Sequence, residues 1–154
     1  MSGNSPEIDL PQLPNARVAI ISSSWHLDIC NDLVAGAQRA LTAAAIKDVE
    51  VIYVPGSFEI PLAAQIAFEK GFNAVVAVGL VLEGETPHFD YVCQGVTQGV
   101  MDVSLKFSSP IGFGVLMFNT LDQAIARSGR PGSSEDKGYD SAVAAIKLLQ
   151  LKEG

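Results

Sequence analysis

The residues of this sequence that are best suited to chemistry lie in the stretch GLVLEGETPHFDYVC, residues 79–93. An apolar run ends there in a turn with a glycine and a proline, which sets His88 at the start of a predicted helix. Gly84 permits close approach of the backbone, Thr86 supplies a hydroxyl, and N–H groups at a helix start can bind a phosphate. Histidine titrates near neutral pH, so His88 beside such an anion suits proton transfer, although a lone histidine is more often structural.

Three further groups at predicted strand ends could bind a ligand, and each also has a structural explanation. Trp25 follows the first predicted strand and could stack on a flat heterocycle, or pack in the core or in an interface. Ser57 could cap a helix whose first turn carries Glu59, or both residues could hydrogen-bond a polyol or a heterocycle. Arg127 could favour the C-terminus of a short helix as a cation, or clamp a phosphate with two hydrogen bonds.

The sequence predicts no metal site and no phosphate loop of the common kind. His26 and Cys30 are four residues apart and could form half of a metal site, but the chain offers no convincing second half. Gly79 and Gly84 have the spacing of a phosphate loop but lack its Gly-Lys-Ser/Thr ending.

Four apolar segments predict the strands that must position these residues: Arg17–Ser22, Val49–Val54, Ala74–Leu82 and Ile111–Phe118. Helical patterns alternate with them, over Asp28–Ala45, from Ser57 to about Lys70, and over Phe89–Phe107, Leu121–Ser128 and Tyr139–Lys152. This alternation predicts an α/β fold of the flavodoxin-like kind, with three layers: a four-stranded parallel sheet and helices on both faces. Such sheets bind ligands beyond the carboxyl ends of their strands, where the residues above lie.

Phe113 lies early in the fourth predicted strand and does not fit a site of this kind within one chain. At ~3.3 Å per residue it is roughly 15 Å from the carboxyl end of its strand. It should therefore not reach a ligand that lies over the other strand ends.

Composition limits the partners of the chain. The sequence has 154 residues, enough for one domain with a sizeable core. Hydrophobic residues make up 48%, and the mean hydropathy of +0.28 indicates extra apolar surface for partner subunits. A net charge of −7 argues against binding to nucleic acid or to an anionic membrane.

Two cysteines, Cys30 and Cys93, do not make a disulfide scaffold, so we expect a reducing cytoplasmic location.

The N-terminal segment is polar and rich in proline, with neither the basic region nor the apolar core of a signal peptide. We expect residues 1–14 to form a flexible tail and residues 15–154 to form a single domain. No apolar run approaches the length of a membrane span.

Taken together, these motifs resemble the 6,7-dimethyl-8-ribityllumazine synthase family, most closely its actinobacterial members. The likeness covers nearly the whole chain after the tail. It rests on SSWH (23–26), VPGSFEIP (54–61), GETPHFDYV (84–92), GFGVL (112–116), QAIARSG (123–129) and DKGYDSA (136–142).

The resemblance implies an enzyme that condenses 5-amino-6-(D-ribitylamino)uracil with 3,4-dihydroxy-2-butanone 4-phosphate. The products are 6,7-dimethyl-8-ribityllumazine, phosphate and water, in the penultimate step of riboflavin biosynthesis, and no metal or cofactor is needed. Carried over by motif, His88 transfers protons, while Glu85, Thr86 and Arg127 bind the butanone phosphate. The residues implied to bind the ribitylaminouracil are Trp25 by stacking, Ser57, Phe58, Glu59, Leu80, Val81, Leu82, Phe113 and Lys137.

The resemblance also implies an assembly with active sites between neighbouring subunits. Phe113, Arg127 and Lys137 would come from the adjacent chain, which resolves the distance problem of Phe113. The loop GRPGSSEDKG is longer than the loop associated with icosahedral capsids of this family, which favours a free homopentamer. A departure is Glu83, because many members have Arg or Lys at that position.

Two other functions remain open from the sequence. One is a paralogue of the same fold, such as the archaeal-type riboflavin synthase, which dismutates the lumazine product. The other is a non-catalytic flavin-binding or structural oligomer. The presence of both His88 and Arg127 argues against the latter, since flavin storage needs neither residue.

Overall fold

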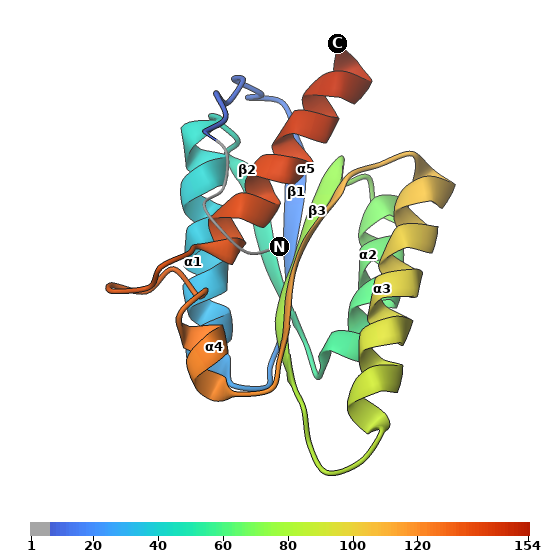
Figure 1. Ribbon diagram of the computed structural model, residues 1–154. Coiled ribbons are helices and arrows are strands. Elements are labelled where there is room, and N and C mark those ends of the chain that lie inside the picture. The colour runs from blue at the N-terminus through green and yellow to red at the C-terminus, as the bar shows by residue number, and fades with distance from the viewer. Residues whose placement is uncertain (1–6) are drawn as a thin grey trace.

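The computed structural model describes residues 7–154 and has a four-stranded parallel sheet at its centre. The strands are β1 (Arg17–Ser23), β2 (Asp48–Val54), β3 (Ala74–Leu82) and β4 (Ile111–Phe118). Their order across the sheet is β2-β1-β3-β4, and every neighbouring pair is parallel. The carboxyl ends of the strands therefore lie together, at the lower end of the sheet in Figure 1.

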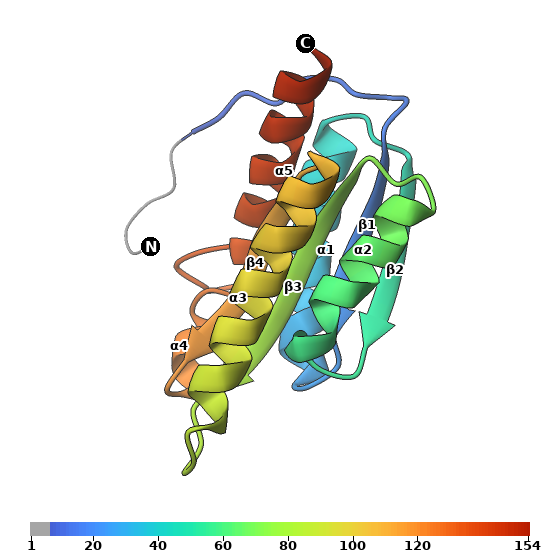
Figure 2. The same ribbon diagram turned by 90° about the vertical axis from the view of Figure 1, so that its right-hand side faces the viewer.

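Helices cover both faces of this sheet, as Figures 1 and 2 show. One face carries α1 (Leu27–Ala43) and α5 (Lys137–Glu153), and the other carries α2 (Ile60–Glu69) and α3 (His88–Phe107). The short helix α4 (Leu121–Ile125) follows β4, and a 3-10 turn, η1 (Ser57–Glu59), precedes α2. The predicted three-layer α/β fold is confirmed. Within residues 7–154, none of these helices combines the length and apolar character needed to cross a membrane.

The inner strands are apolar on both sides because each side packs on a helical layer. Val18 and Ile20 of β1 belong to the core cluster under α1 and α5. Ala19 and Ile21 belong to the cluster under α2 and α3. Successive side chains of a strand point to opposite faces, so this alternation divides one apolar run between two cores.

Element boundaries differ from the sequence prediction mainly at helix ends. Helix α5 begins at Lys137, two residues early, because the Asp136 side chain accepts a hydrogen bond of 3.1 Å from the Tyr139 N–H. Helix α4 ends at Ile125, where the chain turns into a loop. The interpretation of Ser57 as a helix cap is wrong: the helix that it precedes has no side-chain cap, and Ser57 Oγ is buried.

The described part of the predicted N-terminal tail lies against the domain. Leu10 and Leu13 pack on the cluster under α1 and α5. The Leu13 N–H donates to the Ala44 carbonyl at 2.8 Å, and Gln12 Nε2 donates to the Ala43 carbonyl at 3.0 Å. Residues 10–13 are therefore held at the end of α1, and residues 1–6 of the predicted tail lie outside the described residues.

Candidate active site

A pocket of about 910 Å³ lies at the carboxyl ends of β1, β2 and β3 and extends to the start of α3. We call it the Trp25 pocket. The parallel sheet brings its lining residues together from loops that are far apart in the sequence. Nine residues predicted from the sequence line it: Trp25, Ser57, Phe58, Glu59, Leu80, Val81, Leu82, Thr86 and His88.

Trp25 presents its indole at this pocket and is 69% exposed. It is therefore not a core residue of the chain, and the stacking and interface interpretations both remain. The indole lies against the turn after β2: a Cβ on Gly56 would be 3.4 Å from Trp25 Nε1 and 3.5 Å from Glu59 Oε2. The thiol of Cys30 donates a hydrogen bond of 3.2 Å to the Trp25 carbonyl, which fixes the backbone at this point.

Small residues make room for two residues that line the Trp25 pocket, Ser57 and Phe58. A Cβ on Gly79 of β3 would lie 2.6 Å from Ser23 Oγ and 2.8 Å from Ser57 Oγ. Ser57 Oγ is buried with no hydrogen-bond partner among the described residues. A Cβ on Gly95 would lie 2.6 Å from the ring of Phe58, which is itself 62% exposed. Glycine at these positions lets the serine hydroxyl and the phenyl ring approach β3 and α3.

His88 is the first residue of α3 and is exposed at the rim of the Trp25 pocket. Its backbone N–H donates to Thr86 Oγ1 at 3.4 Å, so the hydroxyl and the imidazole belong to one turn. The strand end before this turn is fixed by a hydrogen bond of 3.0 Å from the Glu83 N–H to the Phe118 carbonyl. Glu85 is exposed in the same turn and does not line the pocket.

The other three predicted residues lie in a second pocket, of about 600 Å³, lined by β4, by α5 and by Arg127 after α4. We call it the Arg127 pocket. Phe113, Arg127 and Lys137 line it, and it shares no lining residue with the Trp25 pocket. Phe113 is 41% exposed. The structure thus separates the predicted site residues of one chain into two groups, as the position of Phe113 along its strand predicts.

Carboxylates hold the two cations of the Arg127 pocket. Arg127 Nε lies 3.3 Å from Glu135 Oε2, and the guanidinium carbon lies 4.7 Å from the centre of the Phe118 ring. Lys137 Nζ lies 3.7 Å from Glu135 Oε2 and 3.7 Å from Asp140 Oδ2. Arg127 Nη1 also donates to the Gln123 carbonyl at 3.0 Å, which is the contact expected of a cation at the end of α4.

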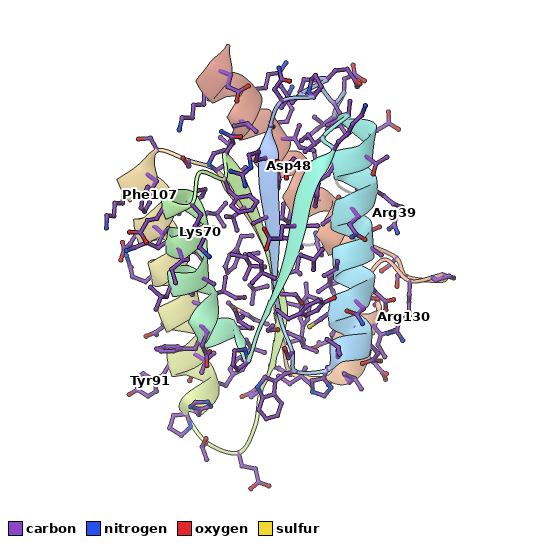
Figure 3. The ribbon with its side chains drawn as sticks, turned by 180° about the vertical axis from the view of Figure 1, so that it is seen from behind. Arg39, Asp48, Lys70, Tyr91, Phe107 and Arg130 are labelled. Carbon is purple, nitrogen blue, oxygen red and sulfur yellow. The ribbon has the colours of Figure 1, made fainter. Side chains whose placement is uncertain are left out.

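The loop between α4 and α5 is tied to α1 by three ion pairs that the sequence analysis missed. Arg130 donates from Nε to Asp32 at 2.7 Å and from Nη2 to Asp28 at 3.5 Å. The hydrogen bond to Asp32 raises the pKa of Arg130, which favours the charged guanidinium. Arg39 of α1 pairs with Asp136, the residue that caps α5. Figure 3 shows Arg39 and Arg130 along α1, on the side of this loop.

Metal-binding clusters and reactive thiols are not features of the described residues. Within residues 7–154, no group of three or more His, Cys, Asp or Glu side chains is placed to hold a metal ion. Cys30 and Cys93 are free, and burial raises the pKa of both thiols.

Comparison with known proteins relates this arrangement to one enzyme family. The family model described as 6,7-dimethyl-8-ribityllumazine synthase matches residues 15–153. A relative of that name from Streptomyces coelicolor is 48% identical over 147 residues, which cover 95% of this chain and 91% of the relative. One from Pseudarthrobacter chlorophenolicus is 49% identical over 152 residues (95% and 94%), and one from Mycolicibacterium vanbaalenii is 48% identical over 155 residues (97% and 98%). The chain belongs to the 6,7-dimethyl-8-ribityllumazine synthase family.

Membership of the lumazine synthase family confirms the resemblance that the sequence motifs indicated. The structure adds lining residues of the Trp25 pocket to which the sequence analysis assigned no role in substrate binding: His26, Phe89, Tyr91 and Val92. Three of the four lie in the motif GETPHFDYV, so the motif itself was the signal. Glu135 was also missed, because nothing in the sequence of a long loop marks one carboxylate as the partner of two cations.

Proposed function

We propose that this chain is a transferase that condenses 5-amino-6-(D-ribitylamino)uracil with 3,4-dihydroxy-2-butanone 4-phosphate to give 6,7-dimethyl-8-ribityllumazine, phosphate and water. Family membership supports the reaction. The observation that carries the proposal is the Trp25 pocket, which combines an exposed indole with an exposed histidine in a turn suited to a phosphate. The indole can stack on the flat heterocycle, the turn can bind the phosphate ester, and the histidine can transfer protons during the condensation.

The proposed chemistry asks little of the protein beyond binding and proton movement. The pyrimidine amine attacks the ketone carbonyl and water is lost. Removal of a proton from the carbon next to the resulting imine expels phosphate and leaves an enol, which tautomerises to a ketone. The second amine attacks this ketone and closes the ring with loss of another water. Trp25 stacks on the pyrimidine, while Ser57, Phe58, Glu59 and the backbone of residues 80–82 bind the ribitylaminouracil. Holding the two reactants together in this way accelerates the reaction by proximity. His88 supplies and removes protons beside the leaving phosphate.

The proposal places each active site between two copies of the chain. Among the described residues that line the Trp25 pocket there is no Lys or Arg, although one substrate carries a phosphate. The Arg127 pocket has both kinds of cation and an exposed phenyl ring. Phe113, Arg127 and Lys137 of one copy would complete the Trp25 pocket of its neighbour, with Arg127 joining Glu85 and Thr86 around the phosphate.

Exposed apolar side chains support association of this kind. Leu62 of α2 is 64% exposed, and Tyr91, Met101 and Leu105 of α3 are 69%, 54% and 70% exposed. Figure 3 shows Tyr91 on the first turn of α3, on the outside of the helical layer. Apolar residues in such numbers on two neighbouring helices are typical of a surface that partner subunits cover. We propose a homopentamer, located in the cytoplasm.

An absorbance assay with both substrates tests the reaction directly, because closure of the second ring extends the conjugated system of the pyrimidine. We expect product only when both substrates are present. Product formation from lumazine alone would instead identify a riboflavin synthase, and flavin binding without turnover would identify a storage protein. Sedimentation at micromolar concentration tests the assembly: we expect a species near five subunits, and an active monomer would refute the shared site.

A further inference from the structure

Glu135 lies between the two cations of the Arg127 pocket and contacts both of them. Its Oε2 is 3.3 Å from Arg127 Nε and 3.7 Å from Lys137 Nζ. The side chain is only 12% exposed, and Oε2 is buried without a well-aligned hydrogen bond among the described residues. A buried carboxylate is costly to keep unless nearby charges balance it, so its ion pairs are what maintain it here.

Backbone hydrogen bonds fix the position of this carboxylate. The Glu135 N–H donates to the Ala126 carbonyl at 3.1 Å, and the Glu135 carbonyl accepts from the Gly129 N–H at 3.1 Å. The next residue but one, Lys137, donates its N–H to the Arg127 carbonyl at 3.0 Å. These backbone hydrogen bonds therefore hold Glu135 close to Arg127 and Lys137, the two cations that its side chain contacts.

We infer that Glu135 is a positioning residue that holds Arg127 and Lys137 ready for the two substrates. This inference rests on the proposed function, in which Arg127 binds the butanone phosphate and Lys137 the ribitylaminouracil. Two cations in one pocket repel each other, and a carboxylate between them removes the repulsion and fixes their directions before substrate arrives. Arg127 loses less side-chain freedom on binding when it is already held in this way.

The geometry predicts unequal effects on the two substrates. Lys137 retains Asp140 as a partner at 3.7 Å when Glu135 is neutralised, whereas the Arg127–Glu135 ion pair is lost. We therefore expect the KM for the butanone phosphate to rise more than the KM for the pyrimidine. The catalytic rate should change little, because proton transfer is assigned to His88 and Glu135 is assigned no contact with the substrates.

The test is steady-state kinetics of Glu135→Gln against both substrates, with Glu153→Gln at the far end of α5 as the control of equal charge change. We expect a KM for the butanone phosphate raised about 3- to 10-fold, a KM for the pyrimidine raised about 2- to 3-fold, and kcat within about twofold of wild type. Glu135→Asp keeps the charge but shortens the side chain. We expect it to raise both KM values, as Glu135→Gln does.

A double-mutant cycle separates positioning from a general effect on the fold. If Glu135 acts through Arg127, Glu135→Gln should not raise the KM for the butanone phosphate further in an Arg127→Ala background. Full additivity, or a KM that falls or stays unchanged in the single variant, would overturn the inference alone. A wild-type chain that forms no lumazine would overturn the proposed function, and the inference with it.

Discussion

Replacing Gly112 by alanine should destabilise the fold and disturb the Arg127 pocket, because β4 has no room for a side chain there. A Cβ on Gly112 would lie 2.0 Å from the carbonyl oxygen of Ser141 and 2.8 Å from its carbonyl carbon. Both are backbone atoms of α5, so the contact can be relieved only if the helix and the strand separate. Reaching an ordinary contact of ~3.5 Å requires a shift of roughly 1.5 Å.

The size of the effect follows from this geometry. Overpacking typically costs ~1–3 kcal/mol, and a clash with backbone places Gly112→Ala at the upper end, about 2–3 kcal/mol. In a chain of this length each kcal/mol lowers the Tm by ~2–4 °C, so we expect a Tm about 4–12 °C below wild type. Phe113 and Lys137 lie on the two elements that must separate. The KM for the pyrimidine should therefore rise at temperatures where the variant is folded.

Thermal unfolding followed by circular dichroism, at equal protein concentrations, measures this difference. Gly84→Ala is the matched control, because a Cβ on Gly84 meets nothing within 4 Å and neither glycine has a positive φ. The control should lie within about 0.5 kcal/mol of wild type. Equal Tm values for the two variants would show that α5 and β4 are not packed as tightly as described.

Three further predictions test individual roles in the proposed site. Trp25→Ala should weaken binding of product analogues by ~1–3 kcal/mol, about 5- to 150-fold, and unchanged affinity in titrations of the folded variant would make Trp25 an interface residue. Arg127→Ala should raise the KM for the butanone phosphate by about one to two orders of magnitude, since a charge-assisted hydrogen bond contributes ~1.5–3 kcal/mol, and an unchanged KM would remove its role. His88→Ala should lower kcat by no more than ~10² with smaller changes in either KM, because the leaving phosphate can itself carry protons. An unchanged kcat would leave His88 without a role in proton transfer.

The fold could be predicted from the sequence wherever one physical signal dominates. The bounds of β3 and β4 agree with the prediction, because each is an apolar run bounded by turn residues. The start of α5 was missed because it depends on Asp136, whose side chain caps the helix only once Gly36 and Gly129 have made room for it. Propensity cannot show a cap that tertiary packing creates.

In the candidate site too, features set by the strand pattern could be predicted from the sequence, whereas contacts that depend on tertiary packing could not. Residues of the Trp25 pocket were predictable because a parallel sheet gathers its strand ends at one edge. The separation of Phe113 was predictable from the rise per residue along β4. Glu135 was not predictable, because its contacts depend on the path of a ten-residue loop that no periodicity constrains.

In the proposed assembly, the division of charge between the two pockets makes activity depend on association. A single chain keeps its two pocket cations beside Glu135 and Asp140, which balance their charge and fix their directions. The Trp25 pocket has the indole and the imidazole but no lysine or arginine among its described lining residues. Association would supply the missing positive charge to the Trp25 pocket and would cover apolar side chains of α2 and α3. The hydrophobic contact would then stabilise the assembly, while the ion pairs within each chain keep the cations oriented at an interface that must admit two polar substrates.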